Sequence, residues 1–133
     1  MTVRDAVINV LINFGRFSGR ATPCELGGWL LAVTGATVLQ LLFDAVVSAP
    51  LLGFEPFAAG AGRPLTVIGS LLLLIPTLAT MSRRLHDTSR PAAWLLLLLV
   101  PILGWAVLGW MLSRPSLPRD NRYGSDVIGL LRT

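Results

Sequence analysis

The chain has 133 residues, of which 53% are hydrophobic and 14% charged, and its mean hydropathy of +0.70 lies outside the usual range of soluble proteins. All eleven basic residues are arginines that flank apolar stretches, so the net charge of +4 indicates phospholipid phosphates, not nucleic acid, as its counter-ions. Without lysine the chain forms no Schiff base, and with Cys24 as its one cysteine it forms no internal disulfide or thiolate metal cluster, so we expect no cofactor and no metal.

The N-terminal residues have the spacing of an amphipathic helix. This spacing predicts a helix lying in the membrane interface with its apolar face down. Ile8 and Ile12 blur the stripe, so part of a packed helix is the alternative. A turn is expected at residues 17–20. The apolar positions recur at steps of three and four and are Val3, Ala6, Val7, Val10, Leu11 and Phe14.

The first long apolar stretch, 26–47, follows helix-start signals and carries a face of small residues. Pro23 suits a first turn, where its missing N–H costs nothing, and Glu25 meets the positive end of the helix dipole. Gly28, Ala32 and Ala36 repeat every fourth residue, which would let another helix approach closely. The same repeat also arises by chance in helices rich in glycine and alanine.

Asp44 is the one ionisable residue well inside an apolar stretch. Charged groups inside membranes are by default functional hypotheses. Asp44 lies near the end of its span, however. We therefore expect its carboxylate to reach the interface or to bond Gln40.

Helix-breaking residues divide the rest of the apolar sequence. Residues 48–64 are rich in proline and glycine, which predicts an exposed loop. The second span, 65–81, contains Pro76 and is expected to be kinked or short. Pro101 and Gly104 split the third apolar stretch, 92–112, which is therefore either a single kinked span or a re-entrant hairpin.

The arginines favour the hairpin, because cytoplasmic flanks of membrane helices accumulate arginine. If the third stretch crosses once, six arginines face one side and five the other. If it returns, ten share one side and only Arg63 faces the other. The tip of such a hairpin must be surrounded by protein, since lipid leaves backbone polar groups unsatisfied.

We therefore predict an all-α integral membrane protein with two transmembrane helices, a returning hairpin and both termini in the cytoplasm. About 20 apolar residues cross a hydrocarbon core, which the long stretches reach or approach. Polar residues interrupt residues 1–19, so no cleavable signal peptide is predicted. The single membrane domain, 1–133, comprises an interfacial helix and turn at 1–22, a helical bundle at 26–112 and a cytoplasmic tail at 113–133.

The densest polar stretch, 82–91, contains the candidate binding site. Guanidinium groups hold phosphate through paired hydrogen bonds, and histidine exchanges protons near neutral pH. A structural role is the alternative, with arginines that follow the topology rule, an aspartate paired with one of them, and a histidine in a local hydrogen bond. The candidates for binding a lipid headgroup or another phosphate are Arg83, Arg84, His86, Asp87 and Arg90.

A returning third stretch would bring the C-terminal charges to the same membrane face as residues 82–91. We expect the resulting ion pairs to close the helix bundle rather than to catalyse a reaction. The expected pairs are Asp120 or Asp126 with Arg83 or Arg84, and Glu25 with Arg20 or Arg90. The predicted cytoplasmic network comprises Arg20, Glu25, Asp120, Arg122 and Asp126.

Three separated blocks carry a family resemblance. They are Phe17-Ser18-Gly19-Arg20-Ala21 with Glu25, Arg83-Arg84-Leu85-His86-Asp87-Thr88 with Arg90 and Trp94, and Pro101 and Gly104 followed by Asn121-Arg122-Tyr123-Gly124. Together they resemble the DUF805 family of small bacterial inner-membrane proteins over residues 14–126. The resemblance implies a multi-pass protein of the bacterial inner membrane and brings no catalytic assignment. Departures from the family pattern at residues 22–27 and 89–94 favour a derived role.

We predict a non-enzymatic membrane module, either an accessory or structural subunit that packs against a larger inner-membrane complex or a protein that associates with itself. The short length and the scarcity of polar groups within the spans support this prediction. The expected partners are membrane phospholipids and a membrane protein or a second copy. The alternative is a lipid-headgroup-binding or small-solute transport protein that uses residues 83–90.

Overall fold

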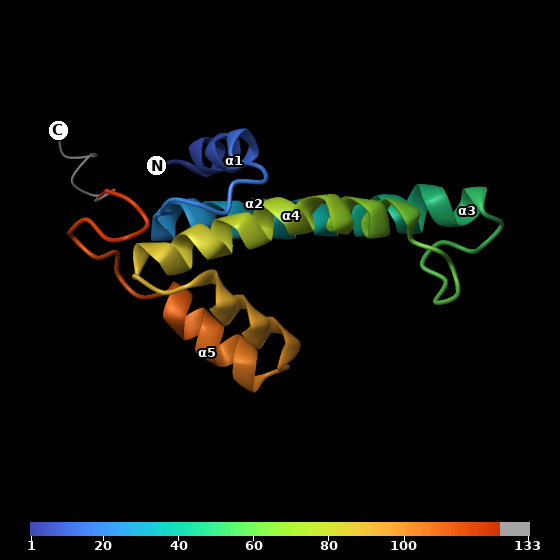
Figure 1. The fold of residues 1–133 in the computed structure, drawn as a ribbon. Coiled ribbons are helices and arrows are strands. Elements are labelled where there is room, and N and C mark those ends of the chain that lie inside the picture. Colours follow the sequence, from blue (N-terminus) through green and yellow to red (C-terminus); the bar gives the residue numbers. More distant parts are fainter. Residues whose placement is uncertain (126–133) are drawn as a thin grey trace.

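The computed structural model describes residues 1–125, and over these residues the chain consists of helices and loops without a strand. Figure 1 shows two long helices side by side, with a short helix along one flank and a compact hairpin on the other. In chain order the elements are α1 (Val3–Ile12), α2 (Pro23–Phe43), the π-helix η1 (Asp44–Ser48), α3 (Ala49–Leu51), α4 (Pro64–Asp87), the 3₁₀ helix η2 (Ala92–Leu99) and α5 (Leu103–Leu112).

The two long helices form the frame of the molecule. α2, η1 and α3 make one continuous helical rod, Pro23–Leu51, and α4 returns beside it. Proline occupies the first turn of both rods, and Oγ1 of Thr22 accepts a hydrogen bond from the backbone N–H of Glu25. Both rods are long and apolar enough to cross a membrane. Most of their large apolar side chains are exposed, as suits contact with lipid.

α4 is longer than the predicted second span. It contains Pro76 and extends without interruption to Asp87, so of the two expected outcomes, a kinked or a short span, the short span is wrong. Near the proline, Oγ1 of Thr80 donates to the carbonyl oxygen of Pro76 at 2.8 Å. The polar residues after the apolar stretch remain helical because their side chains are buried among partners from other segments. Four of the five candidate residues therefore lie on α4, and Arg90 lies in the segment that follows it.

α1 packs against the first turns of α2. Thr2 and Asp5 form a capping box, and the hydrogen bonds from Thr2 lower the pKa of the Asp5 carboxyl group. Ala6 and Val10 are buried, and a Cβ added to Gly28 would lie only 2.8 Å from the Cβ of Ala6. Part of the apolar face that was predicted to meet lipid therefore meets protein.

The third apolar stretch reverses direction. η2 is followed by a turn in which Ile102 adopts a φ of +62°, and α5 then packs back against η2. Nε1 of Trp105 donates to the carbonyl oxygen of Leu98 at 3.0 Å, which supplies one backbone group near the turn with a partner. A Cβ added to Gly104 would lie 2.1 Å from the carbonyl oxygen of Leu97, so the close approach of the two halves requires glycine.

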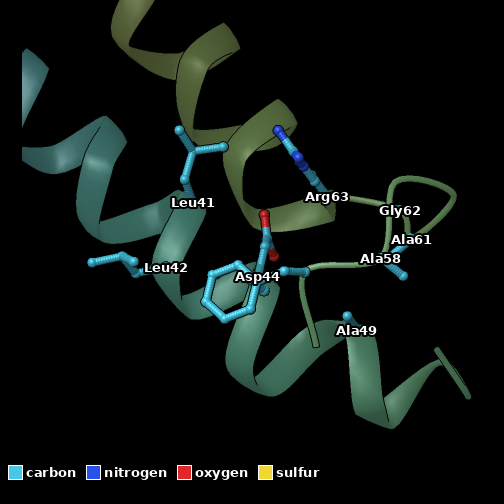
Figure 2. Close-up of a pocket in the computed structure, with 10 residues that line it drawn as sticks. Leu41, Leu42, Asp44, Ala49, Ala58, Ala61, Gly62 and Arg63 are labelled. Atoms are coloured by element: carbon cyan, nitrogen blue, oxygen red, sulfur yellow. The ribbon is translucent and has the colours of Figure 1, made fainter. Parts of the chain in front are cut away.

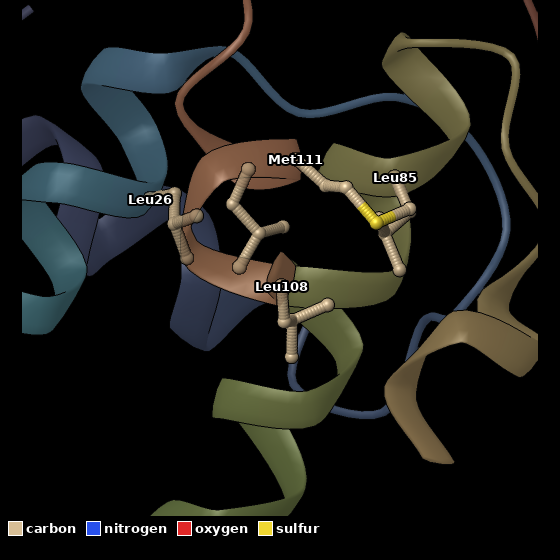
Figure 3. Close-up of a cluster of buried hydrophobic side chains, with 5 residues drawn as sticks. Leu26, Leu85, Leu108 and Met111 are labelled. Carbon is tan, nitrogen blue, oxygen red and sulfur yellow. The ribbon is translucent and has the colours of Figure 1, made fainter. Parts of the chain in front are cut away.

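A small hydrophobic core joins this hairpin to the long helices where α2 begins and α4 ends. Figure 3 shows side chains from α2, α4 and α5 pointing toward one another there. The core comprises Leu26, Leu85, Leu108, Met111 and Leu112, with Met81, Leu95 and Leu97 packed against it. This contact fixes the end of α5 beside the last turns of α4.

At the opposite end of the bundle, Asp44 connects the two long helices. Its side chain is buried, and its carboxylate accepts the backbone N–H groups of Leu65 at 3.2 Å and Thr66 at 2.7 Å. The first N–H groups of a helix lack partners within the helix, and a negative charge there complements the helix dipole. The carboxylate therefore serves the start of α4 rather than Gln40. Figure 2 shows it beside a cavity of about 200 Å³ that Arg63 also lines.

Candidate functional site

Charged residues converge at the end of the bundle where α2 begins and α4 ends. Three segments meet there: residues 17–22, the last two turns of α4, and residues 113–125 after α5 (Figure 1). We call the buried charged residues at this meeting point the arginine network, which consists of Arg20, Glu25, Arg83, Arg84 and Asp87.

Asp87 binds two guanidinium groups at once. Nε of Arg20 donates to Oδ1 of Asp87 at 2.8 Å, and Nη1 of Arg84 donates to Oδ2. The three side chains are at most 1% exposed. Because an unpaired buried charge is strongly unfavourable, this carboxylate allows both arginines to be buried.

Arg84 also holds the end of α5. Its Nε donates to the carbonyl oxygen of Leu112 at 3.0 Å, and its Nη2 donates to the carbonyl oxygen of Arg114. The last carbonyl groups of a helix lack partners within the helix and carry the negative end of its dipole. The guanidinium group supplies both the donors and the charge that this helix end requires.

Arg20 connects the first segment to the last. Its Nη1 donates to the carbonyl oxygens of Arg119 at 2.8 Å and Ser125 at 3.1 Å, and its Nη2 donates to that of Leu117 at 2.7 Å. Residues 113–125, which were assigned to a cytoplasmic tail, are therefore fastened to the helix bundle.

Arg83 pairs with Glu25. Nη1 of Arg83 lies 2.9 Å from Oε1 of Glu25, and both side chains are at most 5% exposed. The sequence suggested Arg20 or Arg90 as the partner of Glu25, and this pairing is wrong. The physical reason is that Asp87 occupies Arg20, while Arg83 lies on the side of α4 that faces the start of α2.

Both neighbouring arginines of α4 have a carboxylate partner in the described residues, and their expected pairing with Asp120 or Asp126 stays a prediction. Arg83 binds Glu25, and Arg84 binds Asp87. Asp120 is an exposed residue of the segment that follows α5, and Asp126 lies outside the described residues.

His86 stacks on an aromatic ring from the C-terminal segment. The ring centroids of His86 and Tyr123 are 3.9 Å apart, with an angle of 4° between the planes. Nδ1 of His86 lies 3.3 Å from the carbonyl oxygen of Gly19, and Nδ2 of Asn121 donates to the carbonyl oxygen of His86 at 2.9 Å. His86 thus faces the turn and Tyr123, whereas Asp87 faces two arginines, and the adjacent pair forms no proton-transfer dyad.

The remaining candidate arginines lie over aromatic rings. The guanidinium carbon of Arg90 is 5.7 Å from the ring centroid of Trp110, and that of Arg114 is 4.0 Å from the same ring. Arg122 lies 4.7 Å from the ring of Tyr123. These distances suit cation–π contacts. Arg90 therefore does not take part in the arginine network.

The predicted packing face of α2 is partly used within the chain. Gly28 faces α1, and Ala32 and Ala36 are half-buried. Two other glycines of α2, Gly27 and Gly35, are open, because a Cβ at either would meet nothing within 4 Å. The open side of this helix is thus offset from the face that the sequence indicated.

The arrangement suits structural closure more than chemistry. Each of the three nitrogens of the Arg84 guanidinium donates to a protein oxygen. Of the arginine network, sequence reasoning assigned Arg20 and Glu25 to a network of ion pairs and the three residues of α4 to a headgroup site. It missed the stacking of His86 on Tyr123 and the binding of carbonyl groups by Arg20. The sequence signal that could have indicated these contacts is the presence of both family blocks, at residues 17–21 and 121–124, in one chain.

Comparisons with known proteins find one matching family and curated relatives from Escherichia coli. The family described as "Protein of unknown function (DUF805)" matches residues 14–125. The chain is 35% identical to the inner membrane protein YhaH of Escherichia coli K12 over 122 residues, which cover 92% of this chain and 95% of that protein. It is 37% identical to the inner membrane protein YhaI of the same strain over 122 residues, with 90% and 92% covered. No solved structure matches the chain.

Proposed function

The chain belongs to the DUF805 family, and from this we propose that it is a multi-pass inner-membrane protein without enzymatic activity. It serves as an accessory or structural subunit that packs against a larger inner-membrane complex or against a second copy. The observation that carries this proposal is that the buried charged residues bind other parts of the chain. In the described part of the chain, Arg20, Arg84 and Asp87 are buried and bound to one another and to backbone carbonyl groups, and they hold three segments together.

The outer surface supports the same role. Gly27, Leu31, Gly35 and Leu39 recur every fourth residue along α2, and the two leucines are 64% and 69% exposed. In a bilayer, helices associate through close packing of small residues and not through the hydrophobic effect. This open side of α2 is therefore the surface on which we place the partner helix.

The proposed topology follows from the reversed third stretch. With the η2–α5 hairpin returning to the side from which it started, nine of the ten described arginines lie on the cytoplasmic side and Arg63 alone on the other. Both termini are then cytoplasmic, and α1 lies at the cytoplasmic interface. η2 contacts α4 and α5, while the large apolar residues at the tip of the hairpin, Leu99, Ile102 and Leu103, are 71% to 81% exposed.

A copurification experiment tests the proposed role. A tagged chain is extracted in a mild detergent, and its copurifying membrane proteins and its mass are determined. We expect a defined membrane partner or a dimer, and we expect Gly35→Leu to abolish it by filling the open side of α2. Gly109→Leu is the matched control, since Gly109 is an equally open glycine on α5. Recovery of the monomer alone from the unmodified chain would contradict the proposal.

The alternative prediction is that residues 83–90 bind a lipid headgroup. Arg84 and Asp87 would have to leave buried ion pairs before they contacted a ligand, which is unfavourable. Replacement of His86 by alanine tests this alternative. It should reduce copurified lipid if the prediction holds and leave the lipid unchanged if His86 serves only to stack on Tyr123.

A further inference from the structure

A polar cavity lies beside the arginine network, between α1, the turn at residues 15–20 and α4. Its volume is about 220 Å³, several times the roughly 30 Å³ share of one water molecule in the liquid. The side chains that line it are Asn9, Asn13, Arg16, Ser18, Arg20 and Arg83. Among the described lining residues three are arginines and none is acidic.

Arg83, which lines the cavity, has an unused hydrogen-bond donor. Its side chain is 5% exposed, its Nη1 pairs with Glu25, and its Nη2 donates to Oγ1 of Thr80 at 3.3 Å. Its Nε is buried and has no hydrogen-bond partner in the described residues. A buried donor left without a partner is unfavourable, and a bound acceptor in the cavity would satisfy it.

The charge balance also favours an anion. The arginine network contains three guanidinium groups and two carboxylates, which leaves one net positive charge in a buried region. Arg16, which is exposed at the edge of the cavity, adds a further positive charge. Guanidinium groups bind phosphate oxygens through charge-assisted hydrogen bonds, and the amides and the hydroxyl group of the lining supply further polar contacts.

We propose that this cavity binds a phosphate group, supplied either by an anionic phospholipid headgroup or by free phosphate. Arg16 and Arg83 hold the anion, and Asn13 and Ser18 complete its surroundings. The site is distinct from the sealed pair of Arg84 and Asp87, and it requires α1 as one wall. The inference does not depend on the proposed subunit role.

The test uses the full chain in a neutral detergent without phosphate. The probes are phosphatidylglycerol and inorganic phosphate, and binding is measured by native mass spectrometry and by the shift in melting temperature. Arg16→Gln should weaken binding about tenfold, the loss expected for one charge-assisted hydrogen bond. The control is Arg4→Gln, which removes an exposed arginine of α1 outside the cavity, and its binding should equal that of the unmodified chain.

The two probes distinguish the sources of the anion. A response to the lipid that inorganic phosphate does not displace assigns the cavity to a headgroup, whereas displacement by phosphate assigns it to the phosphate group alone. Equal binding by Arg16→Gln and Arg4→Gln would overturn the proposal, as would the lack of a response to both probes. Arg16 is exposed and outside the arginine network, so its replacement leaves the fold intact, and an unchanged melting temperature without ligand verifies this.

Discussion

Two buried guanidinium groups depend on a single carboxylate, that of Asp87. Arg20 and Arg84 approach it from different segments of the chain, and both also bind backbone carbonyl groups. At the scale of single residues, Asp87 therefore connects α4 with the turn at 17–20 and with the segment after α5. Removing its charge leaves two cations buried with only dipoles around them.

We predict that Asp87→Asn lowers the free energy of unfolding by about 3–5 kcal/mol, because the side chain keeps its shape but loses its charge. The measurement is unfolding in mixed detergent micelles. Glu55→Gln serves as the control, since Glu55 is exposed in the loop at the other end of the bundle, and surface changes of this kind stay within about 0.5 kcal/mol. Equal stability of the two variants would show that the Asp87 charge is dispensable.

At the scale of elements, α4 and the hairpin each depend on a contact made outside the element itself. The first N–H groups of α4 are capped by a carboxylate from η1, and its last turns bind three other segments. The hairpin closes because glycine lets α5 approach the end of η2. In both cases the stabilising contact comes from a segment outside the helix that it stabilises.

Replacing Asp44 with alanine removes the acceptor for the N–H groups of Leu65 and Thr66. We predict a loss of about 0.5–2 kcal/mol, the usual cost of a lost helix cap. Hydrogen exchange at these two amides should become faster while exchange in the middle of α4 does not change. Asp44→Asn keeps an acceptor oxygen and should give an intermediate effect. Unchanged exchange in the alanine variant would remove Asp44 as the cap.

Gly104→Ala should destabilise the hairpin, since the new Cβ would lie 2.1 Å from the carbonyl oxygen of Leu97. The expected cost is about 1–3 kcal/mol in the free energy of unfolding, as for other overpacked sites. The matched variant Gly109→Ala adds the same group to an open position of α5 and should be neutral or stabilising through helix propensity. Equal stability of both variants would mean that η2 and α5 do not pack this closely.

At the scale of the whole molecule, the two ends of the bundle differ in character. The arginine network, α1 and the segment after α5 lie at one end, and the loop between α3 and α4 lies at the other (Figure 1). Charge and apolar surface are thereby separated along the length of the protein, as orientation in a bilayer requires.

Reporter fusions test the proposed orientation. A fluorescent protein attached to either terminus should fluoresce in bacterial cells, and alkaline phosphatase at the same positions should be inactive, because the proposed topology places both ends in the cytoplasm. Phosphatase inserted after Gly60, in the loop between α3 and α4, should be active. Opposite results at the two termini would mean that the third apolar stretch crosses the membrane.

By itself, the sequence determined that this chain is helical and suited to a bilayer, and that it belongs with the DUF805 proteins. Apolar length and scarce charge are properties of consecutive residues, so a local reading suffices for them. The tertiary structure decided which charges pair, that Gly28 receives α1, and that Asp44 caps α4. These contacts join residues far apart in sequence, as in Arg20 with Asp87, 67 positions apart, and Arg20 with Ser125, 105 apart. Which arginine pairs with which carboxylate depends on where the side chains lie in three dimensions. The sequence, with its eleven arginines, therefore allowed several pairings, and the fold selected among them.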